Sequence, residues 1–314
     1  MVVGDPKQIE PVFTVPIKLI EALAVHAHLP GDRELAPHLT SVQVLADGAN
    51  ALGTPVQFEG KRQWIGSPLR VHRRCVEPMF SIANQIAYNN KMVFSDPKNP
   101  AARSPPADSL NVGDSAWVQL HGAADSKQAV AAQISLVFEA LVALVGSTGS
   151  LPPLYIVSPF KRIKDELLER ISRPENWPSL TVRGANARLK KDLDKWCRAH
   201  IGTVHTFQGK EQSIVWLVLG CDHQTESAAQ WAADKPNILN VALTRAKHRF
   251  FMIGDAALWG KQKYFAVACQ ALPLISADEF MHRVGHAPLL TKDAAGTNIS
   301  VPAALPLEEK GRLP

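Results

Sequence analysis

Two arginines stand where their surroundings favour contact with an anion. Arg74 lies in a basic turn ahead of an expected helix at 76–90, where positive charge opposes the helix dipole and so favours an external anion. Arg245 lies on an expected helix at 238–246 of small and apolar residues, which would hold its side chain rigidly. A guanidinium forms a fixed fork that suits phosphate oxygens and keeps its charge when it loses water. These positions predict contact with a phosphate group, although a solvated turn and a surface arginine are the simpler alternatives.

A third polar segment follows a short apolar run at the start of the chain. Met1-Val2-Val3 reads as the end of a strand and runs directly into Gly4-Asp5-Pro6-Lys7-Gln8. Gln8 could orient a water molecule or form a hydrogen bond with a terminal phosphate. Taken by itself, an ordinary turn between a strand and a helix explains the segment equally well.

Two segments with glycine and lysine invite comparison with a phosphate-binding loop. That loop needs four residues between its glycines, followed by Lys-Ser or Lys-Thr, so that amides wrap the phosphates and a hydroxyl reaches magnesium. Six residues separate Gly202 from Gly209, and Lys210 is followed by Glu211. Gly53 to Gly60-Lys61-Arg62 departs in the same way. We therefore expect a chain that offers arginines to a phosphate but has no loop to hold it.

Composition sets the broad class of the chain. Of its 314 residues 46% are hydrophobic, which predicts a globular protein with a substantial core. No apolar run approaches the length of a membrane helix and no secretion signal is evident, so neither a membrane span nor export is expected. The net charge of +5 is compatible with nucleic acid but weak on its own. The cysteines are widely spaced, which favours reduced thiols in the cytoplasm and no metal site.

Strands and helices alternate from about residue 67 onward. Strands are expected at 116–120, 154–157, 200–204, 213–219 and 249–253. Helices are expected at 12–29, 76–90, 127–145, from 160, at 187–198 and at 238–246. This order predicts an α/β fold with a mostly parallel sheet covered by helices on both faces. Residues 30–66 and the Pro-rich 95–108 read as loops, and the periodicity fades after Leu272.

The order and spacing of these clusters resemble one family, the superfamily-1 helicases. Gly4 to Gln8 resembles motif III, Arg74 lies in a segment similar to motif IV, and Ser158-Pro159-Phe160 resembles the element that follows it. Thr203 to Glu211 is similar to motif V and Val241 to Lys247 to motif VI. Among these helicases, the residues of the motifs are most similar to those of the Upf1-like branch, also called the DNA2/NAM7 type. The resemblance covers roughly residues 1 to 255 and implies a RecA-like fold.

In that family ATP and Mg²⁺ lie between two RecA-like domains, and the resemblance implies roles for matched residues. Gln8 would sense the terminal phosphate from the first domain, while Arg74 and Arg245 would reach it from the second. Further nucleotide contacts are implied for Asp5, Gln208, Gly209 and Glu211. Contacts to single-stranded nucleic acid are implied for Ser158, Pro159, Phe160, Thr203, His205 and Thr206. His205 stands where the family often has Asp, and His72-Arg73 where it often has Gln-Tyr.

The family's phosphate-binding and magnesium-binding motifs, Walker A and Walker B, precede motif III and are not found here. We therefore expect the end of a first RecA-like domain and a connecting segment at 1–66, a second RecA-like domain at 67–272 and a weakly structured tail at 273–314. Such a chain would be the C-terminal motor domain of an ATP-dependent DNA or RNA helicase, inactive alone. Its partners would be a single strand and an N-terminal helicase half. A non-catalytic binding module that keeps the helicase fold is the alternative.

Overall fold

A computed structural model describes most of the chain between residues 4 and 300. The described residues are 4–9, 14–29, 36, 38, 40–58, 61–95, 110, 112–125, 127–177, 187–285, 290–292 and 298–300. The expected strand end at Met1–Val3 and nearly all of the Pro-rich segment 95–108 lie outside them.

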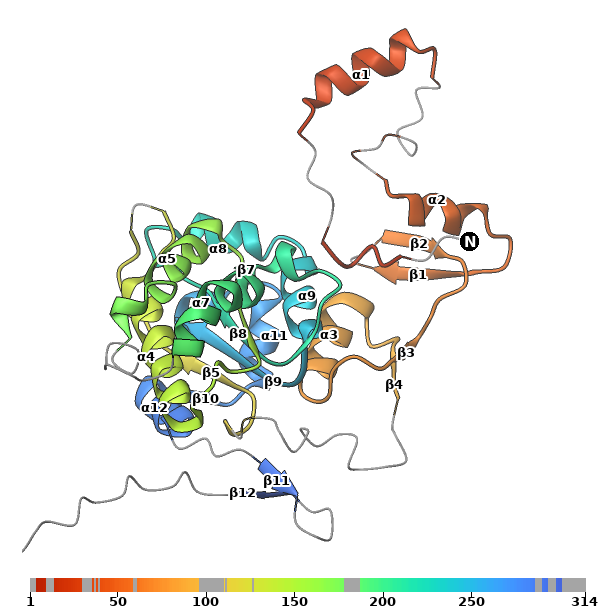
Figure 1. The fold of residues 1–314 in the computed structure, drawn as a ribbon. Coiled ribbons are helices and arrows are strands. Elements are labelled where there is room, and N and C mark those ends of the chain that lie inside the picture. Colours follow the sequence, from red (N-terminus) through yellow and green to blue (C-terminus); the bar gives the residue numbers. More distant parts are fainter. Residues whose placement is uncertain are drawn as a thin grey trace, which may run out of the picture.

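A six-stranded sheet forms the centre of the fold (Figure 1), and all of its strand pairs are parallel. The strand order is β10-β5-β9-β8-β6-β7. The strands are β5 (Ala116–Gln119), β6 (Leu154–Ser158), β7 (Ile201–Thr203), β8 (Gln212–Val218), β9 (Ala246–Gly254) and β10 (Leu274–Ser276). The parallel α/β sheet predicted from the sequence is confirmed.

Helices pack on the sheet in two groups (Figure 1). One group joins helices that contact each other in pairs: α3 (Met79–Tyr88), α9 (Asn237–Arg245) and α11 (Phe265–Ala271). The other comprises α4 (Ala131–Thr148), α5 (Lys161–Ile171), α7 (Ala187–His200) and α12 (Ala277–Gly285). Shorter elements are η3 (Pro174–Asn176), η4 (Val204–Phe207), α8 (Glu226–Ala232) and α10 (Ala256–Trp259).

The central strands are buried on both faces, as helices on either side of a parallel sheet require. In β8 the run from Ile214 to Val218 is at most 1% exposed. Trp216 and Phe251, from β8 and β9, both pack against Phe280 of α12, with ring centroids 5.3 and 5.4 Å apart. These aromatic side chains pack the sheet against α12.

Helix α4 departs from the expectation that no apolar segment reaches membrane-spanning length. Its 18 residues are long and apolar enough to cross a bilayer. Half of the helix is nevertheless buried inside the protein, where it contacts α5 and α12. Such burial is what a core helix on a sheet shows, because its apolar side chains already have protein partners.

Residues 30–66, predicted as loops, contain regular structure. A helix, α2 (Val42–Ala49), is capped by the Ser41 hydroxyl, which accepts from the amide of Val44 at 3.2 Å. A hairpin follows, with β1 (Thr54–Phe58) antiparallel to β2 (Lys61–Ile65). Asp47 of α2 accepts a hydrogen bond from the amide of Gly66 at 3.1 Å, and this bond joins α2 to the end of the hairpin. The sequence pattern missed these elements because they are short and stabilised by a cap and by each other.

Further elements flank this segment. Helix α1 (Ile17–His26) begins later than the predicted residue 12, and none of its residues is buried. Figure 1 shows it apart from the sheet. Two short strands, β3 (Val71–His72) and β4 (Val93–Phe94), pair in parallel on either side of α3 in the sequence.

The predicted start of a weakly structured tail at 273 is wrong for residues 274–285. Strand β10 pairs with β5 at the edge of the sheet, and α12 follows it directly. Phe280 and Val284 of α12 are fully buried. Sequence periodicity failed here because an edge strand of three residues leaves almost no pattern. A separate two-stranded pair, β11 (Leu290–Lys292) and β12 (Asn298–Ser300), lies beyond it.

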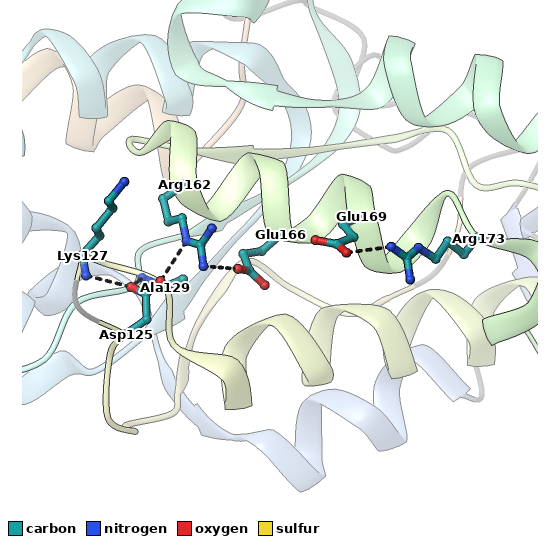
Figure 2. A network of polar contacts seen from close by, with 7 residues as sticks. All are labelled: Asp125, Lys127, Ala129, Arg162, Glu166, Glu169 and Arg173. Atoms are coloured by element: carbon teal, nitrogen blue, oxygen red, sulfur yellow. Dashed lines mark hydrogen bonds and ion pairs between the residues drawn. The ribbon is translucent and has the colours of Figure 1, made fainter.

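A chain of ion pairs fastens the loop after β5 to α5 (Figure 2). Asp125 accepts from Nε of Arg162 at 2.8 Å and from the amides of Lys127 and Ala129. The other side of the same guanidinium meets Glu166 at 2.5 Å. These side chains are partly exposed, so we expect their contribution to stability to be small. Their effect is to fix the start of α5, next to Ser158-Pro159-Phe160.

Candidate nucleotide and nucleic-acid site

Arg245 ends helix α9 with its guanidinium turned into the protein. The residue is 2% exposed. Nη1 donates to the carbonyl oxygens of Lys210 at 2.9 Å and Phe207 at 3.4 Å, and Nε donates to that of Val241 at 3.2 Å. Burial and the nearby charge of Arg74 lower the pKa of Arg245. The charge is therefore held by carbonyl dipoles, with no carboxylate bonded to it among the described residues.

Helix α9 is buried along its whole length, although it carries several polar side chains. All nine of its residues are buried. Asn237, Asn240 and Thr244 follow one another at intervals of three and four, so they share one face of the helix. The Thr244 hydroxyl donates back to the carbonyl of Asn240 at 2.8 Å, while Nη2 of Arg245 donates to Thr244 at 3.2 Å. Most of these buried polar groups have such partners, and the side-chain oxygen of Asn240 is an exception with no hydrogen bond among the described residues.

Arg74 is the exposed counterpart of Arg245. It lies in the turn before α3 and forms no hydrogen bond or ion pair with another residue in the described ranges. The turn is fixed by His72, whose Nε2 accepts from the amide of Cys75 at 3.1 Å. Burial and Arg74 lower the pKa of His72, and burial raises that of the Cys75 thiol to about 12. Arg74 is thus presented to solvent beside a neutral, buried pair.

The Asp5–Gln8 segment lies against α3 and α9. Tyr88 of α3 donates its hydroxyl to Oδ2 of Asp5 at 2.5 Å. Asn240 donates to the carbonyl of Lys7 at 2.8 Å, and Asn237 to that of Gln8. The structure therefore brings Asp5 and Gln8 to the helix that carries Arg245, as the motif resemblance implies.

The loop from Thr203 to Glu211 connects the ends of two strands. It begins with a contact of 3.1 Å between the hydroxyls of Thr203 and Thr206. Gly209 has a φ of +84°, a left-handed conformation that side chains disfavour, and the space where a Cβ would lie is open. Glu211 ends the loop in an ion pair of 3.0 Å with Lys247. The loop thus runs from the carboxyl end of β7 to the carbonyls that hold Arg245.

The residues expected to contact a single strand divide into two groups. Ser158 pairs with Thr203 in the register of β6 and β7, so these positions do meet. His205 and Thr206 are exposed, whereas Ser158, Pro159 and Phe160 are buried. The hydroxyl of Ser158 accepts from the amide of Phe160 at 3.2 Å. Of these residues His205 and Thr206 are therefore exposed to solvent, and Thr203 is half-buried.

Comparison with known proteins places this arrangement in a family. Residues 58–257, well over half of the chain, match the AAA domain family. The chain belongs to that family. It is also similar to the ATP-dependent helicase upf1 of Schizosaccharomyces pombe, with 31% identity over 88 residues. That stretch is 27% of this chain and 9% of the relative, so the chain spans a small part of the relative's length.

The family match and the motifs together identify an Upf1-like superfamily-1 helicase domain with a RecA-like fold. The match begins at residue 58 and ends at 257. It therefore includes the Arg74 turn, the Thr203–Glu211 loop and α9, but not the Asp5–Gln8 segment.

Sequence reasoning missed several residues that lie at this candidate site. Tyr88 gave no signal because it is a single aromatic residue at the end of an apolar helix. Asn237 could have been found, since it shares a face with Asn240 and Thr244 on an otherwise apolar helix. Trp231 of α8 is 58% exposed and packs on Phe160 at 6.1 Å between ring centroids. Its exposure could not be read from the sequence.

The described residues do not form a magnesium site. No group of three or more His, Cys, Asp or Glu able to hold a metal occurs among them. The carboxylates of Asp5 and Glu211 are already bonded by Tyr88 and Lys247. The arginines fit the charge of a phosphate, but the described chain offers no set of ligands for the metal that accompanies ATP in such helicases.

Proposed function

We propose that this chain is the C-terminal motor domain of an ATP-dependent helicase and contributes Arg74 and Arg245 to ATP bound on a first RecA-like domain. The observation that best supports this is the convergence of Arg245, Arg74 and the Asp5–Gln8 segment around helix α9. An exposed arginine without a partner in the described ranges, next to a buried one, is the arrangement expected for a surface completed by an anion.

The proposed chemistry is stabilisation of charge in phosphoryl transfer. Negative charge spreads over the oxygens of the transferred phosphoryl group, and arginines aimed at those oxygens lower the barrier. Arg74 is exposed to solvent in this structure. Arg245 would exchange its bonds to carbonyls of the Thr203–Glu211 loop for phosphate oxygens. Gln8 would orient the attacking water molecule, with Asp5, Gln208, Gly209 and Glu211 around the nucleotide.

The same exchange would couple ATP to nucleic acid. Lys210, which accepts from Arg245, lies in the same loop as His205 and Thr206, which are exposed to solvent. A movement of Arg245 toward a phosphate would free the carbonyl of Lys210 and allow the loop to shift. The exposed end of the loop would transmit that shift to a single strand of DNA or RNA. Ser158, Pro159 and Phe160 would support this end from beneath, with Thr203 beside them.

We propose that the first RecA-like domain, from the same gene product or a separate chain, supplies Walker A, Walker B and hence ATP and Mg²⁺. The purified chain should accordingly hydrolyse ATP at no more than background rates. Turnover at ordinary helicase rates, abolished by Arg245→Ala, would show that the chain holds a complete site and would overturn this part of the proposal.

Binding of a single strand can be tested on the chain itself. We expect filter binding to a single-stranded oligonucleotide to weaken steeply with salt, by a logarithmic slope of about −0.7 for each phosphate neutralised. A double-stranded oligonucleotide of equal length serves as the control for preference. A titration with no salt-dependent binding would contradict the nucleic-acid role and favour a purely structural domain.

A further inference from the structure

Tyr88 and Asn240 meet at a point where three segments of the chain join. Tyr88 is the last residue of α3 and Asn240 lies in the middle of α9. Asn240 Nδ2 donates to the Tyr88 hydroxyl at 3.1 Å and to the carbonyl of Lys7 at 2.8 Å. The Tyr88 hydroxyl in turn donates to Asp5. One continuous set of hydrogen bonds therefore runs from α9 through α3 to the Asp5–Gln8 segment.

The donors of this set are all paired, whereas the side-chain oxygen of Asn240 accepts no hydrogen bond among the described residues. The Tyr88 hydroxyl accepts one bond and donates one, and the amide group of Asn240 donates two. Asn240 is 0% exposed, so none of its lost bonds could be replaced by water without opening the structure. Removing the hydroxyl would leave an N–H of Asn240 unpaired and would take away one of the two donors to Oδ2 of Asp5.

The Asp5 carboxylate determines where Gln8 lies. Its Oδ1 accepts from the amide of Lys7 at 2.9 Å, and its Oδ2 accepts from Nε2 of Gln8 at 3.3 Å. The Gln8 amide donates to the carbonyl of Asp5 at 3.1 Å. Tyr88 binds the same Oδ2 as the Gln8 side chain. The orientation of Gln8 thus depends on a carboxylate that Tyr88 holds in place.

We propose that Tyr88 and Asn240 are positioning residues that fix Gln8 relative to Arg245. Asn240 and Arg245 belong to the same buried helix. The Asp5–Gln8 segment, which is bonded to Asn240, is therefore held at a fixed position relative to Arg245. The proposal rests on the proposed function for the role of Gln8 toward a phosphate. The positioning itself is a property of this chain and can be measured without nucleotide.

The state of the tyrosine supports this arrangement. Burial and the neighbouring Asp5 carboxylate raise the pKa of Tyr88 well above its ordinary value. The hydroxyl therefore keeps its proton and remains a donor to Asp5 throughout the neutral range. Without the proton, tyrosinate and carboxylate would repel each other and the segment would be released.

Hydrogen exchange of the Lys7 and Gln8 amides in the full chain tests the proposal. Both amides donate to Asp5, so Tyr88→Phe should speed their exchange by about tenfold, as expected for the loss of a buried hydrogen bond to a charged group. Asn240→Ala should act in the same direction. Tyr264→Phe, which removes the hydroxyl of another buried tyrosine, is the matched control and should leave both amides unchanged. Unchanged exchange in Tyr88→Phe, with the core amides of β8 equally protected in all variants, would overturn the proposal.

A spectroscopic titration gives a second readout that general destabilisation would not mimic. Burial raises the pKa of Tyr155 as well as that of Tyr88, so tyrosinate absorbance of the full chain should show more than one component displaced to higher pH. The component that is missing in Tyr88→Phe belongs to Tyr88. Asp5→Asn should move it to lower pH, because the neighbouring charge is gone. If Asp5→Asn leaves the titration unchanged, Tyr88 does not bind Asp5 and the proposal fails. A failure of single-strand binding would affect only the proposed function.

Discussion

Nη1 of Arg245 lies 2.9 Å from the carbonyl oxygen of Lys210, which ties the arginine helix directly to the loop between β7 and β8. The bond joins the two most specific motifs of the sequence. Arg245 also has a structural role in this structure, because its bonds to the carbonyls of Phe207 and Val241 are buried. Two arginines with the same proposed role should therefore differ sharply in what they contribute to folding.

Arg245→Ala should lower the free energy of unfolding by about 2–4 kcal/mol, since it leaves carbonyls of the loop without a donor. Arg74→Ala is the matched control and should change stability by less than about 0.5 kcal/mol, because Arg74 is exposed. Urea denaturation of the purified chain followed by tryptophan fluorescence gives both values. Equal effects of the two substitutions would show that Arg245 is not held as described.

The free energy of unfolding should decrease as the pH is lowered from about 7.5 to about 5.5. Burial and Arg74 lower the pKa of His72 below 6.5, so the unfolded chain takes up a proton before the folded chain does. The stability associated with a neutral His72 is present above pH 6.5 and is lost as the pH falls through the folded value. His200 and His248 act in the same direction, because burial lowers their pKa values as well.

His72→Gln tests this contribution, since the side chain cannot take up a proton in this range. Urea denaturation at several pH values should give a shallower dependence for the variant than for the unchanged chain. A slope that is the same in both, or stability that rises toward pH 5.5, would contradict the assignment of a buried neutral His72.

Removing the exposed side chains of His205 and Thr206 should weaken binding of a single strand. For His205→Ala combined with Thr206→Ala we expect a loss of about five- to thirtyfold, which corresponds to about one or two hydrogen bonds. Fluorescence anisotropy with a labelled oligonucleotide measures this. His26→Ala, an exposed histidine on α1, is the control. Undiminished affinity in the double variant would exclude these side chains from the nucleic-acid contact.

The fold was largely predictable because its central strands and helices are strongly periodic. Strand β8 and helix α4 are buried elements of good length, and both lie within a few residues of their predicted bounds. The edge strand β10 and the capped helix α2 were missed, since short elements rely on neighbours that the local pattern does not contain.

The site was predictable only as far as residue types carry chemistry. Arg74 and Arg245 stood out because a guanidinium in these settings calls for an anion. The sequence could not show that Arg245 turns inward, nor that Tyr88 lies next to Asp5 across 83 residues of chain. It also could not distinguish exposed His205 from buried Ser158, because exposure depends on how the strand ends pack.

The turnover number for ATP, measured in a protein that joins this chain to a first RecA-like domain with Walker A and Walker B, tests the central claim most directly. We predict that Arg74→Ala and Arg245→Ala each lower kcat by about a thousandfold, as the loss of an arginine from a phosphoryl-transfer site does. Arg73→Ala, an exposed neighbour in the same turn, should leave kcat unchanged. Undiminished turnover in both Arg74→Ala and Arg245→Ala would contradict the account.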